Sequence, residues 1–170
     1  MAAALQTAAT TSMRQNLTLR PETAADEPFL YELYATTRDY EMVHVPWDDV
    51  QKQAFLRQQC EAQLKHYRLH YRDAEFQIIE LDGRPIGRIY VHRGPQYVCL
   101  MDIALLREYR GRGIGSELTS ELLQQAQAEG KIVTLHVEHM NPARHLYERL
   151  GFKMVEDKGI YWKMEWSAPA

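Results

Sequence analysis

A glycine-rich turn between a strand and a helix constrains the fold of this chain more than any other sequence feature. Residues 105–116 read LLREYRGRGIGS, with glycines at three of five consecutive positions. An apolar run precedes the turn, and apolar residues spaced by four follow it, so the turn joins a strand to a helix. Glycines let backbone N–H groups approach a ligand, and a helix N-terminus carries partial positive charge. With three arginines beside it, the turn predicts a phosphate-binding cradle.

Other phosphate-binding motifs fit this turn less well. A P-loop needs a lysine after its last glycine, and none is present. A dinucleotide fold agrees with Gly111-x-Gly113 and with Glu138 at the end of the next strand, but Ser116 takes the place of its third glycine. A nucleotide-cofactor oxidoreductase is therefore the least favoured of three candidate functions for this chain, and the other two are given below.

Hydrophobic periodicity and turn signals give the order of elements along the chain. The expected elements are a strand at 17–20, a helix from about 26, an irregular segment at 36–47, a helix at 48–71 with an Asp48/Gln51 capping box, an antiparallel meander at 76–81, 85–92 and 97–105, a helix from the turn to Gly130, a strand at 132–138, a helix from Pro142 capped by Asn141, and a hairpin at 152–155 and 160–165. This order predicts a mixed α/β (α+β) domain.

Composition narrows the classes of function. The chain has 170 residues and a net charge of −3, which does not suggest bulk nucleic-acid binding. It has no apolar run long enough to span a membrane, and its two cysteines, Cys60 and Cys99, favour a reduced, cytoplasmic setting. The Ala/Thr-rich residues 1–15 are expected to be a disordered extension before one domain at 16–168.

Two motifs together resemble a known family. Arg110-x-x-Gly113-x-Gly115 is similar to the R/Q-x-x-G-x-G/A signature of the GNAT superfamily of acyl-CoA-dependent N-acyltransferases. Residues 141–152, NPARHLYERLGF, resemble the second motif of that family, which ends in L-Y-x-x-x-G-F. The resemblance covers residues 17–166. It implies a mixed, mostly antiparallel sheet of about six to seven strands, flanked by helices and with splayed central strands.

The resemblance also implies a co-substrate and its contacts. Acetyl-CoA would bind with its pyrophosphate at the turn and its pantetheine along the preceding strand, where a backbone N–H would polarise the thioester carbonyl. No metal is expected. The cofactor-binding residues carried over are Ile103, Ala104, Leu105, Arg110, Gly111, Arg112, Gly113, Ile114, Gly115, Ser116 and Asn141.

Catalytic roles follow from the same comparison. Tyr147 occupies the usual general-acid position, although its place on an apolar helical stripe also allows simple packing. An ammonium acceptor must lose a proton before attack, and Glu138 is the first choice of base. His136 and Asp102 are alternatives, and a structural role is open for each of the three. Asn141 lies six residues before Tyr147, whereas the commoner motif has Asn seven before, so Asn141 also fits a helix cap.

The acceptor is expected to be a small-molecule or peptide amine. Residues 21–50 hold eight acids and one base, Arg38, together with several aromatic residues. In the family this region forms much of the acceptor wall, and an acidic wall would favour a cationic amine. A solvated helical face explains the charges equally well. The leading hypothesis is a monomeric or homodimeric N-acetyltransferase without nucleic-acid or membrane partners. The rival is a non-catalytic acyl-CoA-binding module.

Overall fold

A computed structural model describes residues 16–170, in which one mixed sheet contains seven strands in the order β1-β2-β3-β4-β5-β7-β6. The strands are β1 (Leu17–Pro21), β2 (Glu75–Leu81), β3 (Arg84–Arg93), β4 (Tyr97–Leu105), β5 (Ile132–Glu138), β6 (Lys153–Asp157) and β7 (Tyr161–Trp166), and the α-helices are α1 (Glu27–Met42), α2 (Asp49–His70), α3 (Ile114–Ala128) and α4 (Ala143–Arg149). This confirms the predicted fold class and element order. The predicted extension, residues 1–15, lies outside the described residues.

The sheet is antiparallel except at one pair of neighbouring strands, β4 and β5. Asp82 and Gly83, with φ of 52° and 76°, make the tight turn between β2 and β3 that the Asp-Gly pair predicts. Strands β2, β3 and β4 form the predicted meander. The chain then passes through α3 before it returns as β5, as a parallel connection requires.

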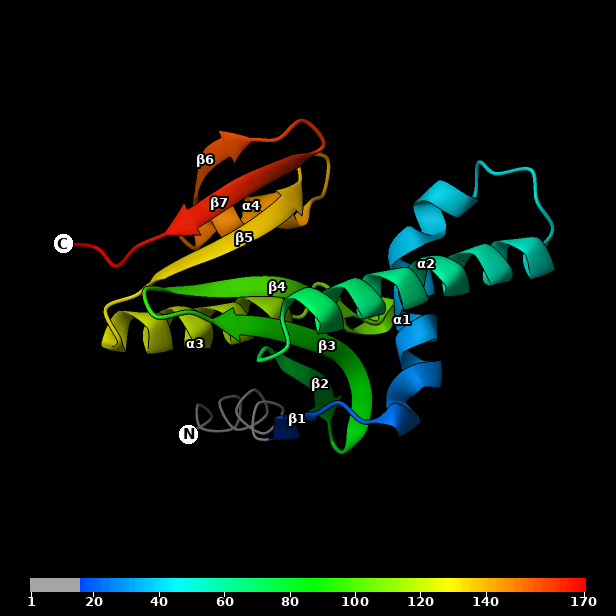
Figure 1. The fold of residues 1–170 in the computed structure, drawn as a ribbon, viewed down its shortest axis with the longest axis horizontal. Helices are drawn as coiled ribbons and strands as arrows, with labels where there is room; N and C mark the ends of the chain where they lie inside the picture. The colour runs from blue at the N-terminus through cyan, green and yellow to red at the C-terminus, as the bar shows by residue number, and fades with distance from the viewer. Residues whose placement is uncertain (1–15) are drawn as a thin grey trace, which may run out of the picture.

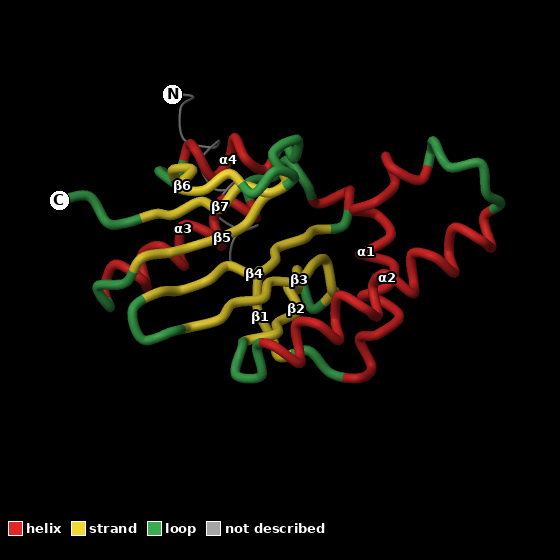
Figure 2. Tube along the Cα trace, turned by 45° about the horizontal axis from the view of Figure 1, so that its top comes forward, coloured by secondary structure: helices red, strands yellow, loops and turns green. Residues whose placement is uncertain are grey.

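Helices cover both faces of the sheet (Figures 1 and 2). On one face, α3 and α4 pack on a core that includes Leu118, Leu122 and Leu135. On the other face, α1 and α2 pack on β2 and β3 through a second cluster that includes Leu30 and Cys60. Alternate residues along each strand point to opposite faces, which gives each face its own core.

The prediction of an irregular segment at 36–47 is wrong in its first half, because α1 continues to Met42. The apolar stripe ends at Tyr34, so periodicity gives no signal for the last two turns. Local contacts support them instead: the Thr37 hydroxyl donates to the Tyr34 carbonyl at 2.7 Å, and Arg38 pairs with Glu41 three residues on at 3.0 Å. These last turns of α1 reach the candidate site.

Candidate active site

The candidate site lies where β4 and β5 separate. Their parallel pairing runs only from Tyr97 opposite Ile132 to Leu100 opposite Leu135, although both strands continue beyond this point. Figure 1 shows the two strands diverging toward the end of the sheet beside α1. The central strands therefore splay, as the family resemblance implies.

A β-bulge in β4 begins at the same point. Tyr90 of β3 is opposite Asp102 and Val91 is opposite Leu100, so Met101 is the extra residue on β4. The bulge shifts the alternation of side chains. As a result, Asp102 lies on the α1/α2 face, where its carboxylate accepts a hydrogen bond from the buried Arg88 side chain at 2.6 Å.

Beyond the bulge, backbone groups of β4 point into the gap between the two strands. The Leu106 N–H donates to the Ile86 carbonyl, so residues 106 and 86 form a hydrogen-bonded antiparallel pair. Such pairs alternate, and Ala104 opposite Arg88 is therefore also bonded to β3. The N–H and C=O groups of Ile103 and Leu105 then face the opposite side, toward β5. Two of the three predicted strand residues thus present backbone groups to the gap, and Ala104 does not.

The glycine-rich turn follows β4 directly and ends at an open helix N-terminus. Gly111 and Gly113 have φ of 71° and 81°, a left-handed conformation that favours glycine. Gly113 is the N-cap of α3 and has no side chain with which to cap it. The amides of Ile114, Gly115 and Ser116 are the first three of the helix and have no partners within it. They form the anion-binding geometry that the sequence predicts.

The arginines of the turn have protein partners. Arg110 donates from Nε to the Leu105 carbonyl at 2.9 Å and from its terminal nitrogen to the Thr36 hydroxyl of α1 at 3.1 Å. Arg107 pairs with Asp39, also on α1. Arg112 lies over the Tyr109 ring, 5.3 Å from its centroid. Arg110 therefore helps to hold the turn against α1 and β4.

Tyr147 of α4 is buried in the apolar cluster against which Ile103 and Leu105 of β4 also pack. Its ring meets Phe152 edge-on at 5.6 Å. Burial, and secondarily the charge of Asp102, raises the pKa of the Tyr147 hydroxyl, so it stays protonated at neutral pH. Asn141 acts at the start of α4, where its side-chain oxygen accepts the Ala143 N–H at 2.9 Å. The helix begins at Ala143, one residue later than predicted.

The three candidate bases have different surroundings. Glu138 ends β5 and pairs with Arg38 of α1 at 3.4 Å. His136 lies on the same face of β5, and burial followed by the charges of two nearby lysines lowers its pKa. Asp102 has a buried partner in Arg88, as described above, which gives it a structural role. Glu138 is the candidate that lies at the open end of the gap.

The acidic segment divides into structural and site-facing residues. Asp26 is buried and forms an ion pair with Arg20 at 2.7 Å. Glu22 accepts a hydrogen bond from the Tyr90 hydroxyl and forms an ion pair with Arg68. These acids serve the fold. Glu41 accepts hydrogen bonds from Arg38 and from the Tyr40 hydroxyl, and it lies beside the site. The sequence analysis treated the acids as one acceptor wall, but the structure shows that some of them pair within the fold and others lie beside the site.

Sequence reasoning missed two side chains at the site, Thr36 and Arg38. Their segment was expected to be irregular, so no helical face was assigned to them. The one available signal was that Arg38 is the single base among eight acids in residues 21–50. Such an isolated charge indicates a partner elsewhere in the fold.

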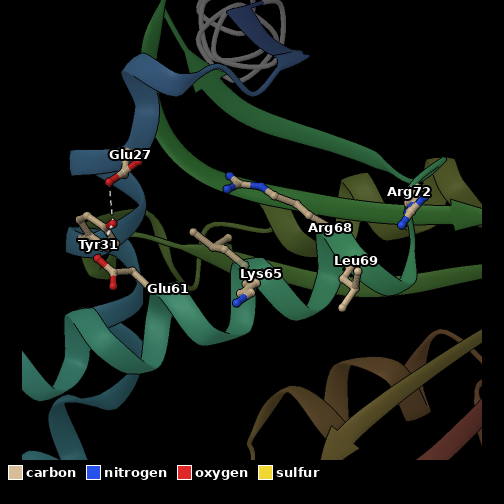
Figure 3. A pocket seen from close by; sticks show the side chains of 8 residues that line it. Glu27, Tyr31, Glu61, Lys65, Arg68, Leu69 and Arg72 are labelled. Carbon is tan, nitrogen blue, oxygen red and sulfur yellow. Dashed lines mark hydrogen bonds between the residues drawn. The ribbon is translucent and has the colours of Figure 1, made fainter.

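Two cavities lie among α1 and α2. The larger, about 590 Å³, is lined by side chains that include Tyr31, Glu61 and Lys65, and the Tyr31 hydroxyl donates to both Glu27 and Glu61 (Figure 3). It contains none of the motif residues. The smaller, about 190 Å³, is lined partly by Arg38 and Glu41 and so adjoins the candidate site.

Within residues 16–170, no helix combines the length and the hydrophobicity of a membrane span. Nor does this part contain a group of three or more His, Cys, Asp or Glu side chains placed to hold a metal ion.

The fold is that of a solved acetyltransferase. The PaiA N-acetyltransferase of Thermoplasma acidophilum, whose crystal structure is a complex with coenzyme A, superposes with a TM-score of 0.68 at 19% identity, over 89% of this chain and 99% of that one. The architecture is thus the GNAT fold. The model of the Acetyltransferase (GNAT) family also matches residues 28–152. The chain belongs to the GNAT acetyltransferase family.

Two curated relatives match in sequence over shorter segments. A mycothiol acetyltransferase of Corynebacterium kroppenstedtii is 39% identical over 83 residues, which cover 48% of this chain and 20% of that protein. The ribosomal protein bS18-alanine N-acetyltransferase of Haemophilus influenzae is 38% identical over 64 residues, covering 37% of this chain and 44% of that protein. The matched segments thus span less than half the length of either relative.

Proposed function

We propose that the protein is an N-acetyltransferase, which transfers the acetyl group of acetyl-CoA to a primary amine by direct attack in a ternary complex. One observation carries the proposal: beyond Leu100 and Leu135, β4 and β5 no longer pair, and the gap between them leads to the open N-terminus of α3. The strand edge suits an amide-containing chain, and the helix N-terminus suits a pyrophosphate. Membership of the family agrees with this assignment.

The residues of the site fit acetyl-CoA. The backbone N–H and carbonyl of Ile103 and the N–H of Leu105 would bond the pantetheine amides in the manner of an added strand, while the Leu105 carbonyl accepts from Arg110. The amides of Ile114, Gly115 and Ser116 would bind the pyrophosphate, because they lack partners within the helix. Arg112 adds positive charge beside them, while Arg110 keeps the turn in place.

The side chains support proton transfer on both sides of the reaction. Glu138 takes a proton from the acceptor ammonium, and the free amine nitrogen attacks the thioester carbonyl carbon. A backbone N–H of β4 stabilises the charge on the carbonyl oxygen. The C–N bond forms as the C–S bond breaks, and Tyr147 gives its proton to the departing sulfur. The nitrogen then loses its second proton to solvent, which leaves a neutral amide, and Tyr147 and Glu138 return to their starting protonation states by exchange with solvent. A thiolate leaves readily, since the pKa of a thiol is near 8.5, so the contribution of Tyr147 is moderate.

The proposed acceptor is a small-molecule or peptide amine. The two sequence relatives are named as a mycothiol acetyltransferase and as an N-acetyltransferase of an alanine in ribosomal protein bS18, and these names point to chemically different acceptors. Glu41 and Glu138 at the open end of the gap favour a positively charged amine. The proposal includes a monomeric or homodimeric protein in the cytoplasm, which agrees with the free thiols of Cys60 and Cys99.

An acceptor screen tests the function. The protein is incubated with acetyl-CoA and a panel of amino acids, polyamines, aminoglycosides and peptides with free N-termini, and CoA thiol release is followed. We expect amine-dependent release and a product heavier by one acetyl group. Binding of acetyl-CoA without turnover on any amine would instead favour the non-catalytic module. Thermal stabilisation by NAD(P) but not by acetyl-CoA would favour the oxidoreductase.

A further inference from the structure

The last two turns of α1 contact both strands of the splayed pair. Thr36 and Asp39 are three residues apart and so share a helix face, which meets Arg110 and Arg107 after β4. Arg38 lies about 200° around the helix from Thr36, and it meets Glu138 at the end of β5. Figures 1 and 2 show α1 crossing the end of the sheet where β4 and β5 diverge. The helix therefore bridges a gap across which the strands no longer bond.

Arg38 is the residue that makes the β5 side of this bridge. One terminal nitrogen lies 3.4 Å from the Glu138 carboxylate and 3.0 Å from that of Glu41, and the guanidinium lies over the Tyr34 ring at 5.5 Å. The Arg38 and Glu138 side chains are only 25% and 26% exposed. Water and salt therefore screen this pair less than a surface pair. The buried Tyr34 ring also limits where the guanidinium can move.

We propose that Arg38 is a positioning residue for acetyl transfer, which holds the Glu138 carboxylate in place at the open end of the gap. The inference rests on the proposed function, in which Glu138 accepts the proton of the amine. A base must lie within reach of the proton that it takes, and the guanidinium 3.4 Å away restrains where the Glu138 carboxylate lies. Glu138 pairs with Tyr161 of β7 but has no partner on β4, so on the side of the gap the contact with α1 restrains its carboxylate.

Glu41 has a secondary part in this arrangement. It shares the guanidinium with Glu138, and it belongs to α1 itself, so its pair with Arg38 is local to the helix. Only the pair with Glu138 joins two elements that are 100 residues apart in the chain. The experiment therefore measures how far the effect of Arg38 on kcat depends on Glu138.

A double-mutant cycle tests the inference, with the amine of highest turnover in the acceptor screen. The variants are Arg38→Met, Arg38→Lys, Glu138→Gln and the double variant Arg38→Met/Glu138→Gln. Arg57→Met is the matched control, because Arg57 also pairs with a glutamate, at 3.2 Å, and lies over a tyrosine ring, at 4.7 Å, but on α2 away from the gap. Melting temperature and acetyl-CoA affinity are measured for each variant.

We expect Arg38→Met to lower kcat about tenfold while acetyl-CoA affinity is retained, and Arg38→Lys to recover part of the loss. In the Glu138→Gln background, Arg38→Met should cause no further loss, and Arg57→Met should stay within about twofold of the parent. Parental kcat in Arg38→Met, or a loss that multiplies fully with that of Glu138→Gln, would overturn the inference while the base role of Glu138 stands. If Arg38→Met does not fold, Arg38→Gln takes its place.

A failure of the proposed function would appear as no amine-dependent CoA release by the parent protein, whereas a failure of the base role of Glu138 would appear differently. If Glu138→Gln keeps the parental kcat, Glu138 is not the base, and the role of Arg38 through it is overturned as well. That result leaves amine-dependent CoA release intact, which separates it from a failure of the transferase assignment itself.

Discussion

Replacing Asp26 by asparagine removes the charge that joins the start of α1 to β1. The Asp26 carboxylate is 6% exposed and receives two hydrogen bonds from the Arg20 guanidinium, at 2.7 and 2.8 Å, as well as the Thr23 N–H at 2.8 Å. The bonds from Arg20, opposed by burial, lower the pKa of Asp26 from 3.8 to about 2. This shift corresponds to about 2.5 kcal/mol of unfolding free energy at pH 7.

The sign of the pH dependence follows from the lowered pKa. The stabilisation is complete above the unfolded-state pKa near 4, and it is lost as the pH falls through the folded-state value of about 2. The parent should therefore exceed Asp26→Asn by about 2.5 kcal/mol at pH 7 and by roughly half as much at pH 3. Urea unfolding followed by circular dichroism at several pH values between 7 and 3 measures this difference.

Asp73→Asn is the control, because the Asp73 side chain is 78% exposed and, among residues 16–170, its ion pair is with His92. It should change the unfolding free energy by about 0.5 kcal/mol or less. A loss in Asp26→Asn no larger than that of the control, or a difference that does not narrow toward pH 3, would refute the reasoning.

Three further predictions concern the site. Gly113→Asp places a side chain where φ is 81° and puts a negative charge at the N-terminus of α3. Calorimetry should therefore show that the folded variant binds CoA at least about a hundredfold more weakly than the parent. Parental affinity would exclude the phosphate-binding cradle. Tyr147→Phe should lower kcat by about tenfold to a hundredfold with acetyl-CoA affinity unchanged; an unchanged kcat, with chemistry rate-limiting, would leave Tyr147 a packing role. Gly87→Ala would press a methyl group against the Ala104 carbonyl oxygen and bring it to 2.8 Å from the Leu105 side chain. Thermal unfolding should show that the free energy of unfolding falls by about 1–3 kcal/mol. A parental melting temperature would contradict this prediction.

Local chemistry explains which features could be predicted from the sequence. The Asp82-Gly83 turn, the Asp48/Gln51 capping box and the glycines before α3 are each set by residues close together in the chain, and each is present in the structure. The end of α1 could not be predicted in this way. Its last turns lack an apolar stripe, and part of their support comes from contacts with residues about 70 and 100 positions away.

The candidate site shows the same division. The sequence by itself determined the order of the elements and the glycine-rich turn, because these depend on periodicity and local motifs, and its family resemblance supplied the short set of candidate proton-transfer residues. Only the tertiary structure decided that Glu138 faces Arg38 at the open gap while Asp102 pairs with a buried arginine. That difference depends on a one-residue bulge in β4 and on the packing of α1 across two strands, and both arise from pairing between segments distant in the chain.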